Sequence, residues 1–258
     1  MKSALISLTL IFLVEGTAYT EEPQQKPRKV PMLIQLTENC ISKMEEYDYE
    51  LKWNDIRYMW NRESNTSELE KGKKISEVSL KLGGNVCPGY RIQNGDATWA
   101  EIGTPISQVK GYDERFRLFV GDDLYEALDG PDAKTMGELF DVAGKVKKVT
   151  LEYEIESPDA PYDYDHYVVD FSKKDSQLFT DHFLASEYVR MEELQKSLSE
   201  NRSRLYVIRF ILQDNSSFHV IYYPEDNAFN RGYGDDVIKE LVEQYAGRAQ
   251  MVPRPPNQ

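Results

Sequence analysis

The stretch Val149-Thr-Leu-Glu-Tyr-Glu-Ile155 alternates strictly between apolar and polar side chains. A period of two is typical of an antiparallel β-strand that buries one face and exposes the other. The segment 166–171 shows the same alternation and supplies a partner strand. Pairing of the two would place Glu152, Glu154 and His166 together on the exposed face.

Helical and extended patterns surround this pair of strands. Helices are predicted over 38–61, 136–143, 175–185, 187–199 and 235–245. The last of these has the clearest signals, because Asp235 can cap its first turn and Gly247 follows its end. Further strands are predicted over 75–82, 116–120, 205–212 and 218–223. Together these elements predict an α+β fold, with an antiparallel sheet covered by helices.

The order helix–strand–strand occurs twice, over about 135–185 and about 190–246, at an offset of 55 residues in its first part. Duplication of one unit explains this repeat, and so do two ordinary hairpins that share the same physics. The strand 205–212 is apolar on both faces except at Arg209, as expected for the centre of a sheet.

The first 18 residues have the features of a secretory signal peptide. Lys2 precedes an apolar run over 4–14, and Gly16-Thr-Ala18 supplies small residues for cleavage. The run is shorter than the roughly 20 residues that span a bilayer, so we expect a secreted, extracellular protein with no membrane insertion.

Proline and polar residues mark the two ends of the remaining chain. We expect a disordered leader over 19–31, a single α+β domain over 32–247 and a flexible tail over 248–258. A subdomain boundary, if one exists, falls near 111–134, after a segment rich in Gly and Pro.

Cysteine and asparagine usage fits an exported chain. Cys40 and Cys87 are the two cysteines, and in an oxidising compartment we expect them to form a disulfide. Asn65, Asn201 and Asn215 each begin an Asn-x-Ser glycosylation sequon within a polar stretch.

The net charge of −13 disfavours nucleic acid as a partner and favours a basic protein or peptide. Two acidic stretches, Glu45-Glu-Tyr-Asp-Tyr-Glu50 and Pro161-Tyr-Asp-Tyr-Asp-His-Tyr167, concentrate tyrosines among carboxylates. Tyrosine beside carboxylates forms a rigid aromatic surface suited to Lys- and Arg-rich partners, and in an exported protein it is also a context for sulfation. The predicted binding residues are Tyr47, Tyr49, Tyr162, Asp163, Tyr164, Asp165 and His166.

The spacings that mark common metal and catalytic sites do not occur. No His-x-x-x-His or Cys-x-x-Cys pair is present, and the loop 226–232 has Arg231 where a calcium loop requires glycine. Nucleophile elbows and phosphate-binding loops are also missing, so no cofactor is expected. We expect the imidazoles of His166 and His219 to lie too far apart for joint chemistry, with His219 buried.

These observations favour a non-catalytic binding protein with an acidic, tyrosine-rich recognition surface. One alternative is a carrier of a small apolar ligand, with Trp53, Trp60 and Trp99 lining its pocket. The other alternative is a hydrolase whose active site carries no recognisable local motif.

Overall fold

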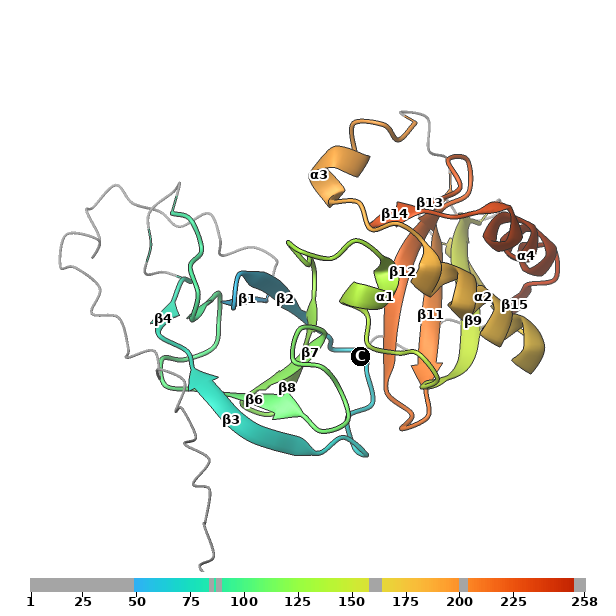
Figure 1. Cartoon of the computed structure of the whole chain (residues 1–258). Coiled ribbons are helices and arrows are strands. Elements are labelled where there is room, and N and C mark those ends of the chain that lie inside the picture. Colours follow the sequence, from blue (N-terminus) through green and yellow to red (C-terminus); the bar gives the residue numbers. More distant parts are fainter. Residues whose placement is uncertain (1–48, 84–85, 87–89, 158–163, 200–203, 253–258) are drawn as a thin grey trace, which may run out of the picture.

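The structure is a computed structural model that describes residues 49–83, 86, 90–157, 164–199 and 204–252. It is mostly β, with 40% of the chain in strands and 17% in helices. Two large sheets dominate it, and Figure 1 shows them as two neighbouring parts of the molecule. The prediction of an α+β fold built on one helix-covered sheet is therefore wrong.

The first sheet has eight strands. In chain order they are β1 (Glu50–Trp53), β2 (Ile56–Trp60), β3 (Lys71–Glu77), β4 (Leu80–Lys81), β5 (Asp96–Ala97), β6 (Pro105–Val109), β7 (Arg117–Val120) and β8 (Asp123–Ala127). The order across the sheet is β3-β6-β7-β8-β2-β1-β5-β4, with β4 and β5 parallel and the other neighbours antiparallel.

The second sheet has seven strands, all antiparallel to their neighbours. They are β9 (Val146–Glu156), β10 (Tyr164–Asp170), β11 (Tyr206–Leu212), β12 (Ser217–Tyr223), β13 (Ala228–Phe229), β14 (Gly232–Tyr233) and β15 (Gln250–Val252). The order across the sheet is β14-β13-β12-β11-β9-β10-β15. The edge strand β15 lies within the segment that was expected to be a flexible tail.

Four helices accompany the second half of the described chain. They are α1 (Met136–Leu139), α2 (Lys173–Ala185), α3 (Met191–Leu194) and α4 (Asp236–Ala246). Of these, α2 and α4 pack on one face of the second sheet, where Phe179 contacts Phe210 and Tyr245 stacks on Phe171 at 4.0 Å. The N-cap predicted for the last helix is confirmed, because the Asp235 side chain accepts a hydrogen bond from the backbone N–H of Ile238. None of the described helices is long and apolar enough to cross a membrane.

The largest error concerns the segment predicted as helix over 38–61. Its described part is a β-hairpin in which Trp53 pairs with Ile56. The turn residues Asn54 and Asp55 have φ values of 51° and 62°, as a two-residue hairpin turn of type I′ requires. Asn and Asp adopt this conformation more readily than most residues, so a turn signal was present between the apolar positions.

Two other predicted helices are single turns. In α1 the helix ends at Leu139 because Phe140 adopts an extended backbone, and Gly144, with φ of 70°, lies within a separate turn. In the segment 187–199, the helix covers α3 alone. These shorter helices are the second reason why the helix-covered fold does not hold.

The strand pattern around the opening stretch is confirmed. Strand β9 pairs with β10 in the register Glu154 to His166 and Glu152 to Val168. Strand β9 also pairs with β11, where Glu152 lies opposite Val207, the residue 55 positions later. The hairpins β9–β10 and β11–β12 are thus related by an approximate twofold axis between β9 and β11. This arrangement is compatible with duplication of one unit and also with two unrelated hairpins.

One hydrophobic core runs through both sheets. The chain passes from the first sheet to the second between Ala127 and Val146. Phe116, next to β7, contacts Phe140 and Phe218 with ring centroids 5.5 and 5.6 Å apart. Phe218 in turn stacks on Phe210 at 4.6 Å, beneath α2. Because these rings are all buried, separation of the sheets would expose a large apolar surface.

Candidate functional site

The two tyrosine-rich stretches do not form one surface in the described residues. Tyr49 precedes β1 of the first sheet, whereas Tyr164 and His166 lie on β10 of the second. Successive side chains of a strand point to opposite faces, so Asp165 lies on the other face of β10 from Tyr164 and His166. Its partner on β9 is accordingly Ile155 and not a glutamate. The other predicted binding residues, Tyr47, Tyr162 and Asp163, lie outside the described residues.

An acidic face covers part of the second sheet, on the side opposite α2 and α4. We define it as Glu152, Glu154, Glu156, Tyr164 and His166, which the β9–β10 register places side by side. The side chain of Glu154 is 47% exposed and Tyr164 is 43% exposed. This face is therefore open to a partner at its outer end.

The predicted covalent sites are only partly within the described residues. Cys40, Cys87 and Asn201 lie outside them, and Asn65 is exposed on a loop. The Asn215 side-chain amide donates a hydrogen bond to Glu68 at 2.5 Å and accepts one from Lys147 at 2.7 Å. A glycan on Asn215 would be attached to the nitrogen that makes the first of these contacts and would crowd Glu68, so Asn65 is the better-placed acceptor of the two.

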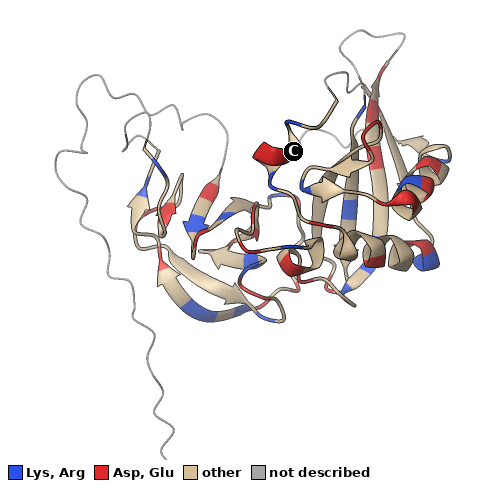
Figure 2. Ribbon diagram, turned by 45° about the horizontal axis from the view of Figure 1, so that its top comes forward, with Lys and Arg blue, Asp and Glu red and all other residues tan. Residues whose placement is uncertain are grey.

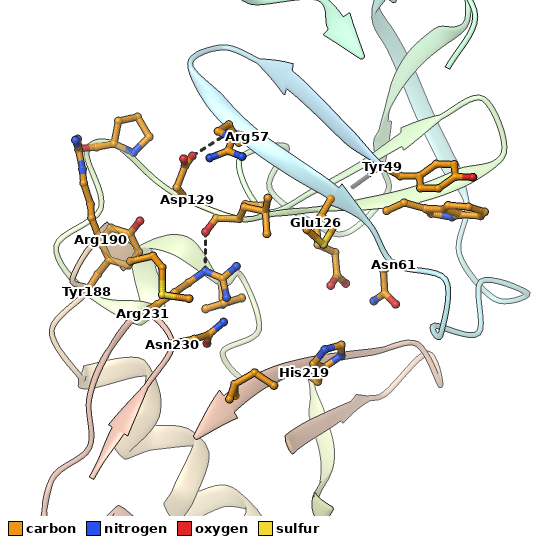
Figure 3. A pocket seen from close by; sticks show the side chains of 18 of the residues that line it. Tyr49, Arg57, Asn61, Glu126, Asp129, Tyr188, Arg190, His219, Asn230 and Arg231 are labelled. Atoms are coloured by element: carbon orange, nitrogen blue, oxygen red, sulfur yellow. Dashed lines mark hydrogen bonds between the residues drawn. The ribbon is translucent and has the colours of Figure 1, made fainter. Parts of the chain in front are cut away.

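A cleft of 840 Å³ lies between the two sheets (Figure 3). Sequence reasoning did not find this cleft, because its residues come from distant parts of the chain. The first half of the described chain contributes Tyr49, Arg57, Trp60, Arg62, Glu63, Glu126 and Asp129, and the second half contributes Tyr188, Arg190, His219, Asn230 and Arg231.

A cluster of charges closes one end of the cleft. Arg209 of β11 binds Glu152 on its own sheet at 2.7 Å and reaches Glu63 of the first half at 2.8 Å. Burial works to raise the pKa of Glu63, but the hydrogen bond and the charge of Arg209 outweigh it and hold this pKa below its usual value. Arg209, the single cation that interrupts the apolar strand 205–212, thus joins the second sheet to the loop between β2 and β3.

His219 lies beside this cluster and not in the interior. Its side chain is 40% exposed, so the prediction that it is buried is wrong. The walls of the cleft still remove enough water that burial lowers its pKa from the ordinary value. The nearest Glu63 oxygen is 3.9 Å from Nδ1, which is too long for a hydrogen bond.

The prediction that the imidazoles of His166 and His219 lie too far apart for joint chemistry is confirmed by the strand order. Strands β9 and β11 lie between β10 and β12, so three strand spacings, about 14 Å, separate the two histidines even before their offset along the strands. The third histidine, His182, pairs with Asp235, the N-cap of α4. None of these placements assembles a nucleophile with a base, and the described residues contain no cluster of three metal-ligating side chains.

The histidine of the cleft makes stability depend on pH. We expect the urea midpoint of unfolding to fall as the pH drops below about 6.5, the ordinary pKa of histidine. The unfolded chain takes up a proton there that folded His219 resists, so stability present at higher pH is lost. Below a pH of about 4.5 the loss of the Glu63 charge adds to this effect. The His219→Asn variant should have a flatter profile between pH 7 and 5, and an unchanged profile would contradict this assignment.

Aromatic side chains form another part of the cleft wall. Tyr49 packs on Trp60 at 4.8 Å and on Trp99 at 5.9 Å. The guanidinium of Arg62 lies over Tyr49 and Trp60 at 4.2 and 4.5 Å, close enough for cation–π attraction. Charged side chains interrupt the apolar lining throughout, so a purely apolar ligand would desolvate them without compensation. The cleft suits a ligand that is itself polar.

Comparisons with protein families, with characterised proteins and with solved structures found no match to this chain. Its function must therefore be argued from its own residues.

Proposed function

We propose that this chain is a secreted, non-catalytic binding protein that uses its acidic face to engage a basic protein or peptide. The observation that carries the proposal is the β9–β10 register, which aligns Glu152, Glu154 and Glu156 on a sheet face that neither α2 nor α4 covers. Secretion is supported by the character of residues 1–18.

The chemistry of the face fits a basic partner. Carboxylates two residues apart on one strand project to the same side at intervals of about 7 Å, a spacing that an extended Lys- or Arg-rich segment can match. Tyr164, opposite Glu156, adds an exposed aromatic ring at the outer end. The net charge of −13 attracts such a partner over a longer range, particularly at low ionic strength.

The acidic face is tested by the double variant Glu154→Gln/Glu156→Gln. With an oligolysine peptide as probe, we expect affinity to fall between roughly twofold and thirtyfold, because each exposed ion pair contributes about 0.2–1 kcal/mol. Isothermal titration calorimetry at two salt concentrations measures the loss, which should shrink as salt is raised.

The matched control is Glu240→Gln/Glu243→Gln on the exposed side of α4, which changes the net charge by the same amount. It should weaken the peptide much less than the first double variant. Equal losses in the two would mean that the probe senses only the overall charge, and the acidic face would be rejected as the binding site.

A further inference from the structure

Arg231 occupies an unusual position in the wall of the cleft. Its Nε donates a hydrogen bond to the carbonyl oxygen of Leu128 at 2.6 Å, which fixes the guanidinium between the two halves of the molecule. Among the described residues, no carboxylate lies within the 4.0 Å of an ion pair with it. Arg57 and Arg209, which also line or close the cleft, both have such partners.

The charge of Arg231 is consequently poorly compensated. Burial lowers the pKa of its guanidinium from the ordinary value, because removal of water disfavours the charged form. Asp129 and Glu126 attract the charge from longer range. Asp129 accepts the backbone N–H of Arg57, and Glu126 lies 2.6 Å from Arg117, so both are already engaged elsewhere. An anion bound at Arg231 would supply the missing partner.

Within the described part of the chain, Asn230, next to Arg231, lacks a hydrogen-bond donor, whereas Arg231 lacks an anion. Its side-chain oxygen Oδ1 is buried and has no hydrogen-bond donor among the described residues. Figure 3 shows Asn230 and Arg231 on the same side of the cleft, with His219 farther along it. A buried acceptor without a donor is costly, and a ligand N–H would satisfy it.

We propose that this part of the cleft binds an α-amino or α-acylamino carboxylate, with the carboxylate on Arg231 and the adjacent N–H on Asn230 Oδ1. We call it the carboxylate pocket, defined by Arg231, Asn230, Phe140, Met191 and Ile221, all of which line the cleft. The apolar members give the ligand's side chain a surface to pack on. A cleft of 840 Å³ admits either a free amino acid or the C-terminal residues of a peptide.

Phosphate fits the same position less well. It brings no N–H for Asn230, and its second negative charge would be repelled by the nearby carboxylates Glu126 and Asp129. The carboxylate pocket is also independent of the acidic face, since the two share no residue. Failure of one proposal therefore leaves the other intact.

The ligand class is tested on the unmodified full chain. Calorimetric titration should show that N-acetyl-leucine binds and that N-acetyl-leucinamide, which has the same shape without the charge, binds at least about tenfold more weakly. Free leucine and short peptides with a free or an amidated C-terminus distinguish the two sources of the carboxylate. Equal binding of acid and amide, binding of inorganic phosphate in preference to the acids, or no binding of any acid at millimolar concentration would overturn the proposal.

Two variants locate the site. Asn230→Asp preserves the shape of the side chain and places a carboxylate beside Arg231, so it should weaken N-acetyl-leucine at least about tenfold. Arg231→Gln should have an effect of similar size, with thermal melting used to establish that it is folded. Glu154→Gln/Glu156→Gln should leave this affinity unchanged. Full binding by folded Asn230→Asp would place the ligand elsewhere and overturn the assignment.

Discussion

Replacement of Arg117 by methionine should lower the free energy of unfolding by about 3–5 kcal/mol, the usual cost of breaking a buried ion pair by removing one partner. Arg117 is completely buried on β7. Its guanidinium lies 2.6 Å from Glu126 and donates to Ser216 Oγ at 2.7 Å and to the Ser217 carbonyl at 3.2 Å. One residue thus ties the first sheet to the turn between β11 and β12 (Figure 2 shows the charges along the ribbon).

The loss should come largely from the carboxylate left behind. The side chain of Glu126 is 15% exposed, so removal of Arg117 would leave this carboxyl group without its partner in a poorly solvated position. Urea unfolding of Arg117→Met, Glu126→Gln and the double variant separates these contributions, and the double variant should recover part of the stability. Arg117→Lys should fall between wild type and methionine, because lysine keeps the charge without the planar fork. A loss below about 1 kcal/mol in Arg117→Met would show that the pair is not buried as described.

Sequence patterns predicted the four central strands of the second sheet, β9 to β12, because these strands are long and regular, but they missed the short strands β13, β14 and β15. Strand β9 has eleven residues and β11 has seven, which is enough for alternation to reveal which side chains share a face. The first sheet gave a weaker signal: the strand predicted over 116–120 matches β7, but the single strand predicted over 75–82 is divided between β3 and β4. Strands β4 and β5 have two residues each, and the pairing of β3 with β6 contains register shifts that break the period.

The cleft could not have been predicted from local spacing. Glu63, Glu126 and Arg231 meet there through the packing of the two sheets, and no motif links them in the sequence. Arg209 and Arg231 did stand out, the first as the one cation in an apolar strand and the second as the residue that disqualified a calcium loop. Both proved to mark the cleft. An arginine that breaks an otherwise regular pattern is thus a useful signal, although its partner cannot be named from sequence.

The second large effect concerns the shared core. Phe116→Ala should lower the free energy of unfolding by about 3–5 kcal/mol, since it removes a fully buried ring that contacts Phe140 and Phe218 of the second half. All three tryptophans, Trp53, Trp60 and Trp99, lie in the first half, so their fluorescence reports mainly the unfolding of the first sheet. The far-ultraviolet signal of helix reports the second half, where α2 and α4 are.

If the two sheets unfold as one cooperative unit, the two signals should give the same urea midpoint in the wild type, and Phe116→Ala should shift both equally. Phe119→Ala provides a matched control, because this ring is buried in a separate cluster with Val109 and Leu124, away from the second sheet. If the two sheets unfold together, Phe119→Ala also lowers the stability of the second half. The urea midpoint of the helical signal should then again equal the midpoint of the fluorescence signal. A fluorescence midpoint that moves alone would mean that the sheets fold independently, and that the cleft between them owes its shape to contacts such as those of Arg117 rather than to a common core.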